Sequence, residues 1–106
     1  MRPMRRDVVA RIEIDSEGRL HVVPASETFP HIWREAMEVH WDTDRHSLYG
    51  PPPREWSRAR WLRQILDAAQ TQGCELLVTD ETEWIGVEPA VKAELVQEGR
   101  PPGGAR

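Results

Sequence analysis

The first apolar pattern in the chain is an alternation over residues 7–14. The alternating positions are Val8, Ala10, Ile12 and Ile14 on one side and Arg11 and Glu13 on the other. A period of two predicts a strand whose four apolar side chains share one face. Residues 15–18 predict a turn, because Gly18 can adopt a positive φ. Residues 19–23 then return as a second strand, which Pro24 ends or places at an edge. We therefore expect an N-terminal β-hairpin.

Residues 28–41 carry two apolar patterns that cannot both hold. Apolar and aromatic side chains recur at helical spacing through most of this stretch, after a threonine and a proline that suit the start of a helix. Residues 37–41 also alternate, as a strand would. The combined pattern favours a short helix at about 30–37 that leads into a strand at 38–42. A turn and a returning strand at 46–49 follow.

The clearest helix of the chain is predicted over about residues 55–72. Gly50 and the three prolines after it exclude a helix or a central strand, so they fix where the next element starts. Half of the helical wheel is then apolar, and Gly73 supplies the C-terminal stop. The apolar stripe consists of Ala59, Trp61, Leu62, Ile65, Leu66, Ala68 and Ala69.

Two further elements complete the predicted fold. Residues 75–79 read as a short buried strand, and residues 89–98 as a short C-terminal helix that Pro89 opens and Gly99 ends. The order of elements predicts an α+β class. We expect a mixed or antiparallel sheet of three to five strands, with the main helix packed on one face.

Length and composition place the chain among globular proteins. With 106 residues, 39% of them hydrophobic and 30% charged, it has the size and make-up of one domain. We expect that domain at 7–99, between a flexible basic arm at 1–6 and a loose tail at 100–106. No apolar run reaches the roughly 18 residues of a membrane helix. A single cysteine, Cys74, excludes an internal disulfide and predicts a small buried side chain. These features predict a cytoplasmic protein.

The charges are unevenly distributed along the chain. The first dozen residues and residues 54–63 each carry a net +3, whereas residues 75–98 carry −6. The net charge of −4 argues against a nucleic-acid partner, which usually meets a basic surface. A short basic N-terminal arm would bind an anionic surface only weakly.

Four potential metal ligands lie close together in residues 40–46. In an extended chain His40, Asp42, Asp44 and His46 would share one face, because side chains alternate along a strand. Imidazole and carboxylate groups are ligands that zinc, manganese and iron accept. Asp-Thr-Asp is also common turn chemistry, and a tight turn would end the alternation. The alternative interpretation is therefore a domain that binds a metal or a small molecule at these four residues. Such a domain could also be an enzyme.

No stretch of the sequence is typical of nucleophilic catalysis or of cofactor binding. Ser47 and Ser57 lack the glycine context of a serine hydrolase, and the glycines form no phosphate-binding pattern. The acidic stretch 80–83 offers paired carboxylates for acid–base work, but such a stretch after a strand is more often a solvated loop. The sequence therefore predicts no cofactor and names no catalytic residue.

Tryptophan and arginine gather where the main helix is predicted to begin. Trp56 lies off the apolar stripe, and Arg54, Arg58 and Arg60 are close to it in sequence. These two residue types often anchor protein interfaces. Trp56 could instead pack on the neighbouring prolines and fix the direction of the helix start. We predict a non-enzymatic module that binds another protein through these residues and Trp84, with a homodimer as a further option.

Several short motifs of the chain are structural in character. They are Trp41-Asp42, the run Pro51-Pro52-Pro53-Arg54-Glu55-Trp56, Trp61, Gln64-Ile65 and residues 79–84. Through them the chain resembles small bacterial domains of the gene-cassette and immunity-protein type, over about residues 29–88. The resemblance implies a compact bacterial α+β domain that binds another protein, and it carries over no functional residue.

Overall fold

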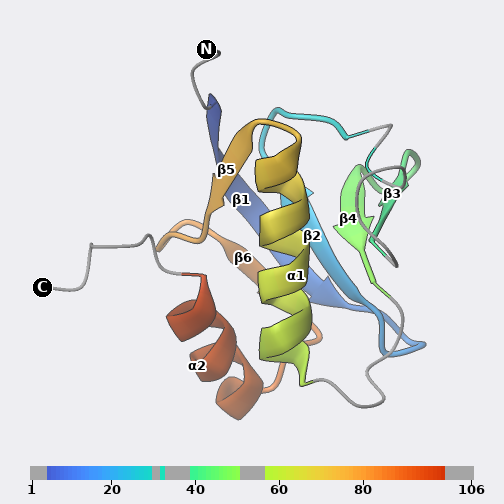
Figure 1. Ribbon diagram of the computed structural model, residues 1–106. Coiled ribbons are helices and arrows are strands. Elements are labelled where there is room, and N and C mark those ends of the chain that lie inside the picture. The colour runs from blue at the N-terminus through green and yellow to red at the C-terminus, as the bar shows by residue number, and fades with distance from the viewer. Residues whose placement is uncertain (1–4, 30–31, 33–38, 51–56, 100–106) are drawn as a thin grey trace, which may run out of the picture.

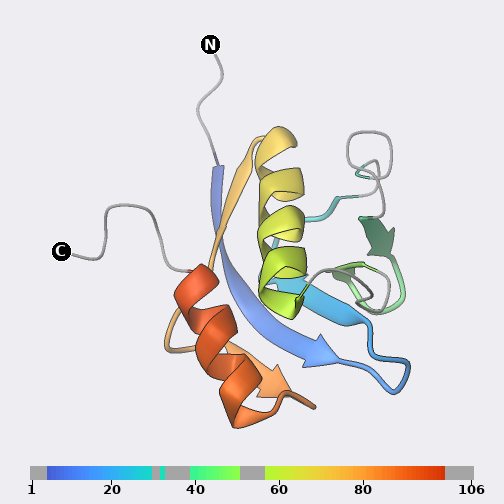
Figure 2. The ribbon, with the colours of Figure 1, turned by 60° about the horizontal axis from the view of Figure 1, so that its bottom comes forward.

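Six strands and two helices follow one another in the computed structural model, which describes residues 5–29, 32, 39–50 and 57–99 (Figure 1). Their order is β1 (Arg5–Ile14), β2 (Leu20–Pro24), β3 (His40–Asp42), β4 (Ser47–Tyr49), α1 (Arg58–Thr71), β5 (Cys74–Leu77), β6 (Glu83–Ile85) and α2 (Pro89–Glu98). Both helices lie on the same side of the sheet (Figures 1 and 2). The predicted α+β class is confirmed.

Strand β1 is the centre of a mixed sheet. It pairs antiparallel with β2, which continues through β4 to β3 in antiparallel order. On its other edge β1 pairs in parallel with two short strands, through Arg5–Val8 with β5 and through Arg11–Glu13 with β6. The sheet thus has one strand more than the three to five expected. The additional strand is β6, whose three residues are too few to show a period of two.

A β-bulge in β1 changes which side chains face the helices. The register shifts between Val9, which faces Pro24, and Arg11, which faces Val23. An extra residue in one strand breaks the strict alternation of side chains. Val9 and Ile12 are therefore both fully buried, whereas Ala10 is exposed. The prediction that Val8 and Ala10 share the core face with Ile12 is wrong, because the bulge turns these two to the opposite side.

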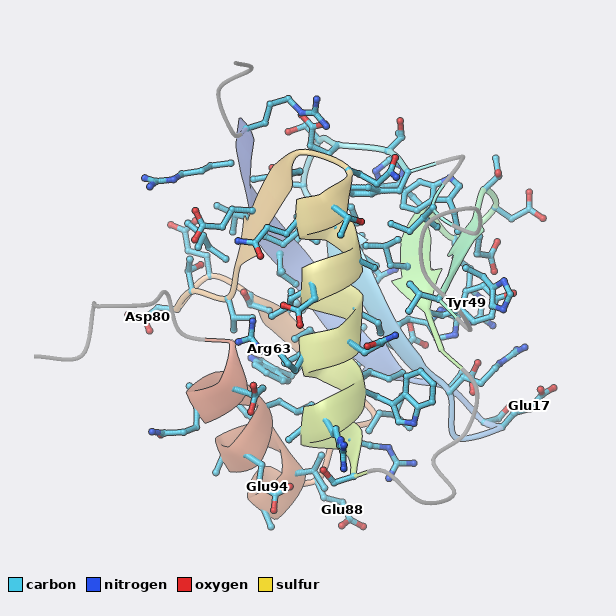
Figure 3. The ribbon with its side chains drawn as sticks, in the orientation of Figure 1. Glu17, Tyr49, Arg63, Asp80, Glu88 and Glu94 are labelled. Carbon is cyan, nitrogen blue, oxygen red and sulfur yellow. The ribbon has the colours of Figure 1, made fainter. Side chains whose placement is uncertain are left out.

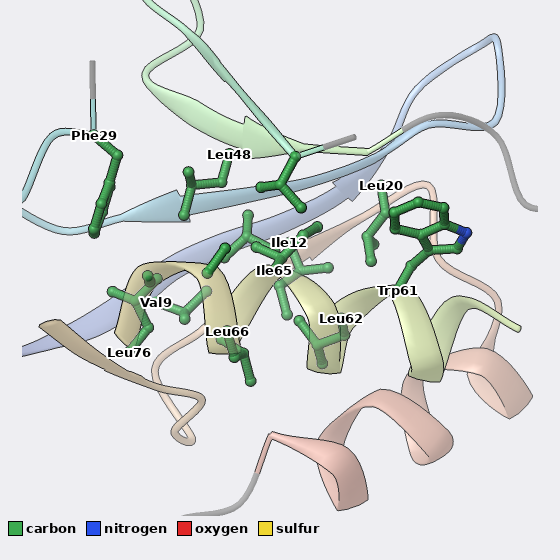
Figure 4. Packing of buried hydrophobic residues seen from close by; sticks show 14 of the residues in the cluster. Val9, Ile12, Leu20, Phe29, Leu48, Trp61, Leu62, Ile65, Leu66 and Leu76 are labelled. Carbon is green, nitrogen blue, oxygen red and sulfur yellow. The ribbon is translucent and has the colours of Figure 1, made fainter. Parts of the chain in front are cut away.

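The hydrophobic core fills the space between the sheet and α1 (Figure 4). Its members from the sheet include Val9, Ile12, Leu20, Val22 and Leu48, and those from α1 are Trp61, Leu62, Ile65, Leu66, Ala68 and Ala69. The predicted apolar stripe of α1 is thus confirmed, with Ala59 packed at its margin. Cys74 is fully buried as expected, and burial raises the pKa of its thiol to about 11.

The ends of the helices follow local sequence signals. Ser57 caps α1, since its hydroxyl accepts a hydrogen bond from the backbone N–H of Arg60 at 3.2 Å, so the helix starts three residues later than expected. Gly73 follows it with a φ of 85°. Helix α2 has the predicted bounds and packs beside α1, where Arg63 pairs with Glu98 at 2.8 Å. No helix in the described ranges is long and apolar enough to cross a membrane.

The two predicted strands around residues 38–49 are present as β3 and β4. They form an antiparallel hairpin in which Trp41 faces Leu48. The short helix expected at about 30–37 lies outside the described residues, apart from Ile32, which is buried.

Candidate functional site

One face of the sheet is left free by both helices. We call it the outer face, meaning the side chains of the strands that point away from α1 and α2. The helices stand together on the other side in both views (Figures 1 and 2). Among the described residues, no helix packs on the outer face. An antiparallel sheet region can expose one face to water in this way, but its side chains are then normally polar.

A row of side chains crosses the outer face from one edge to the other. Glu13 of β1 faces Ile85 of β6 on one side and His21 of β2 on the other. Tyr49 of β4 faces both His21 and His40. The Tyr49 ring lies 5.3 Å from the His21 ring and 5.4 Å from the His40 ring, centroid to centroid. The row therefore carries three neighbouring rings over β2, β4 and β3.

The centre of this row is a buried histidine with polar partners at both ring nitrogens. His21 is 1% exposed. Its Nε2 lies 2.8 Å from the Asp15 carboxylate and its Nδ1 lies 2.9 Å from the Ser47 hydroxyl. An ionised carboxylate can only accept, so His21 Nε2 carries a proton and donates to Asp15. Arg45 Nη1 lies 3.7 Å from the same carboxylate and completes the cluster.

Asp15 organises the turn between β1 and β2 as well as the histidine. Its carboxylate accepts hydrogen bonds from the backbone N–H groups of Glu17 and Arg19 and from Arg19 Nε, each at 2.9 Å. Burial acts to raise the pKa of Asp15, but the hydrogen bonds from His21 and Arg19 outweigh it and hold the pKa far below its ordinary value. Asp15 is therefore a fixed negative charge under this end of the outer face.

The cluster contains the three residue types of a nucleophilic triad, namely Asp15, His21 and Ser47. Its serine, however, is not accessible to a substrate. Ser47 is fully buried, so a substrate cannot reach its hydroxyl. The cluster instead ties the β1–β2 turn to β4 through buried hydrogen bonds. Sequence reasoning missed it because Ser47 lies 26 residues from His21. The signal that was available is Asp15 at the start of a turn, with His21 returning across the hairpin.

An aliphatic patch occupies the other part of the outer face. We define it as Val8, Ala10, Val23 and Leu77. Val8 faces Leu77 across the parallel pair of β1 and β5, and Val23 lies opposite the bulge. None of the four belongs to the core cluster or packs against it. Ile85, 39% exposed, lies on the same face at the β6 edge. The outer face is thus partly apolar where polar residues would be expected.

The four predicted metal ligands do not form a site. Strand β3 ends at Asp42, whose carboxylate accepts from the backbone N–H groups of Asp44 at 3.0 Å and Arg45 at 3.2 Å. His46 has a φ of 55° and packs its ring on the edge of Trp41 at 4.9 Å. This turn ends the alternation that would align the ligands with His40. Across the described residues, no group of three or more His, Cys, Asp or Glu side chains could hold a metal ion.

The predicted protein-binding residues are separated in the structure. Arg54 and Trp56 lie outside the described residues. Arg58 donates to the Gly18 carbonyl in the β1–β2 turn at 3.3 Å, and Arg60 is exposed at the start of α1. Trp84 is half-buried against the core, with the Lys92 ammonium of α2 5.7 Å from its ring. Trp84 therefore lies on the helix side of β6, away from the outer face.

The acidic stretch after β5 is held by a buried threonine. The Thr82 hydroxyl donates to the Val9 carbonyl at 2.7 Å and accepts from the Thr79 N–H at 3.0 Å. Asp80 and Glu81 are exposed beside it, and Asp80 points away from the sheet (Figure 3). This loop has the solvated form that is most common for such a stretch.

These features define a small α+β domain in which both described helices cover one face of the sheet and neither covers the other. A family model described as Integron Cassette Protein Hfx_Cass5 matches residues 7–82, so the chain belongs to this family of integron cassette proteins. A solved structure of integron cassette protein Hfx_Cass5, from the mobile metagenome of the North West Arm sewage outfall, is 48% identical in sequence. The match covers 91% of this chain and 97% of that chain, with a TM-score of 0.47.

The family match tests one part of the predicted resemblance. The likeness to gene-cassette proteins is confirmed by the family match, while the likeness to immunity-protein neighbours stays a prediction. No curated protein sequence matches the chain. The family name records a gene cassette and no activity, so function must be inferred from the geometry.

Proposed function

We propose that this integron cassette protein is a small non-enzymatic module that binds another protein through the outer face of its sheet. The observation that carries the proposal is the aliphatic patch of Val8, Ala10, Val23 and Leu77, which lies on the face that neither helix covers. Covering apolar surface is favourable by roughly 25 cal/mol per Å², so a partner that buries this patch gains free energy of binding. An apolar sheet face without a covering layer is a common mark of an interface.

The surroundings of the patch fit the anatomy of a protein interface. Apolar interface centres are usually bordered by a polar rim, and tyrosine and arginine are enriched in interfaces relative to the rest of a protein surface. Here Arg11 faces Val23 of the patch, and Tyr49, Arg19 and Arg45 lie farther along the same face around His21 and Asp15. The Arg19 guanidinium lies 5.5 Å from the Tyr49 ring centroid, and the His21 cluster beside the patch links β2 to β4 and to the β1–β2 turn. A partner would therefore meet a surface that is already ordered.

The start of α1 has less support as the binding surface. Arg58 is engaged with the Gly18 carbonyl, and Trp84 is packed between β6 and α2. These contacts give both residues a role within the chain. The metal-binding alternative gains no supporting observation, because Asp42 caps the turn that separates its ligands. The outer face is therefore the surface on which the proposal rests.

The proposal is tested by comparing proteins captured from a host-cell extract by matched variants. Val23→Arg places a charge in the patch, and Glu94→Arg places the same charge on the exposed side of α2 (Figure 3). We expect a protein retained by the wild type and by Glu94→Arg to be lost with Val23→Arg. Circular dichroism melting verifies that each variant folds. Equal retention by all three, or no retained protein with the wild type, would contradict the proposal.

A further inference from the structure

The charges on the outer face are already neutralised in pairs. Arg6 lies 3.1 Å from Glu75, and Arg11 lies 3.8 Å from Glu13. At the far end Arg19 lies 2.9 Å from the buried Asp15. A polyanion such as nucleic acid requires a surplus of basic groups, which this face does not present. The suitable partner is one whose surface carries both signs of charge around an apolar centre.

The outward side chains of β1 have a complementary order along the strand. Arg6 lies near its start and Glu13 near its end, with Val8, Ala10 and Arg11 between them. The Arg6 side chain is 74% exposed and the Glu13 side chain is 27% exposed, so both are accessible. Consider a second copy of the chain related by a two-fold axis that lies between the two sheets, perpendicular to β1 and over Ala10. Its Glu13 would lie opposite Arg6 of the first copy, and its Arg6 opposite Glu13. Symmetric dimers are built from such self-complementary surfaces.

We infer that the outer face binds a second copy of this chain, with the two sheets packed face to face. This inference rests on the proposed function, since it takes the outer face as the binding surface and names its partner. The two aliphatic patches cover each other. On either side of them Arg6 of one copy and Glu13 of the other join the existing Arg6–Glu75 and Arg11–Glu13 pairs into a mixed-charge cluster. Packed sheets stand about 10 Å apart, a distance that arginine and glutamate side chains can bridge.

The test is a charge exchange followed by sedimentation equilibrium over a range of protein concentrations. Arg6→Glu alone and Glu13→Arg alone each create two like-charge contacts in the dimer. Each is expected to raise the dimer Kd at least about tenfold. The double variant, Arg6→Glu with Glu13→Arg, restores both pairs with reversed polarity and returns the Kd to near the wild-type value. Glu94→Arg, on the helix side, is the matched control and leaves the Kd unchanged.

The outcomes separate this inference from the proposed function. A wild-type chain that stays monomeric up to about millimolar concentration, the weak end of the affinity scale, overturns the second copy as partner. The capture experiment then still decides whether another protein binds the outer face. A dimer that Val23→Arg weakens but the double exchange does not restore overturns the Arg6–Glu13 arrangement. A dimer that neither Val23→Arg nor the exchange changes lies elsewhere on the molecule, and the assignment of the outer face fails with it.

Discussion

The two faces of the sheet are stabilised by different interactions. On the helix side Val9, Ile12 and Leu48 are fully buried against α1 and form a continuous apolar core. On the outer face the buried side chains include His21 and Ser47, and each ring nitrogen of His21 has a polar partner. The first face is held by packing, and the second by a hydrogen-bond cluster beside a partly exposed aliphatic patch on which no described helix packs. The difference separates residues that hold the fold from those available for binding.

The largest effect is expected from a cavity on the helix side. Ile65 is fully buried in the centre of α1, so Ile65→Ala removes three methyl or methylene groups and leaves space that the core cannot fully close. We expect a loss of about 2–5 kcal/mol in the free energy of unfolding. Urea denaturation followed by circular dichroism measures it. A loss below about 1 kcal/mol would show that the core tolerates the cavity.

A slightly smaller effect is expected from His21→Ala on the outer face. The substitution leaves the buried Ser47 hydroxyl without its ring partner and removes one donor to Asp15. An unsatisfied buried polar group costs about 1–3 kcal/mol, and the lost ring volume adds to it. The same denaturation measurement is used.

Ser47→Ala is the control for the His21 cluster, since it removes one hydrogen bond and keeps the ring and the Asp15 contact. Its loss should be smaller than that of His21→Ala. If His21→Ala cost no more than an exposed substitution, the cluster would not stabilise the outer face.

The sequence predicted the helix side of the sheet better than the outer face. The stripe of α1, the limits of α2 and the N-terminal hairpin follow from periodicity and from local stop signals such as Gly73 and Pro89. The bulge at Val9–Arg11 cannot be predicted in this way, because apolar and polar residues still alternate in the sequence through the extra residue. One shift in phase was enough to move Val8 and Ala10 from the expected core to the candidate binding surface.

The candidate site was missed for a second reason. Its polar cluster depends on contacts between β2 and β4, and pairing between distant strands cannot be read from one sequence. The residues chosen instead were conspicuous types in short windows, such as the histidines and aspartates of 40–46. In the structure these residues do not come together, because the Asp42 carboxylate accepts hydrogen bonds from the backbone of its own turn. Ligands spaced two residues apart share one face only where the chain stays extended.

The pH dependence of stability compares two carboxylates, Asp15 at the end of β1 that carries the His21 cluster and Asp7 near its start. The pKa of Asp15 lies below its ordinary value of 3.8, and so does that of Asp7, which accepts from the backbone of Ser26 and Glu27. A depressed pKa stabilises the folded state at pH values above the unfolded pKa. That contribution is lost as the pH falls through about 4 and below. We expect the free energy of unfolding to fall on acidification, with Asp15 contributing more than Asp7 because its shift is larger.

Asp15→Asn measures this contribution directly. The variant should be less stable than the wild type at neutral pH, and the difference should shrink as the pH is lowered below about 4, because the unfolded wild-type chain then binds a proton at Asp15 while the folded carboxylate still stays ionised. Asp7→Asn is the matched variant and should give a smaller difference of the same sign. The measurement is urea denaturation at a series of pH values. A difference that stays constant from neutral to acid pH would contradict the assignment of the charged form to Asp15.

The smallest effect on the free energy of unfolding is expected from a substitution in the aliphatic patch. This substitution tests directly whether the patch serves binding rather than folding. Val23 is half-buried on the outer face and lies outside the core cluster, so Val23→Ser should change the free energy of unfolding by less than about 1 kcal/mol. The same substitution removes apolar area from the centre of the proposed interface, so it should weaken association measured by sedimentation. Ala59→Ser, at the margin of the core, is the converse control: it should affect stability rather than association. If Val23→Ser reduced stability as strongly as Ile65→Ala, the patch would belong to the fold, and the outer face would no longer be a surface kept for a partner.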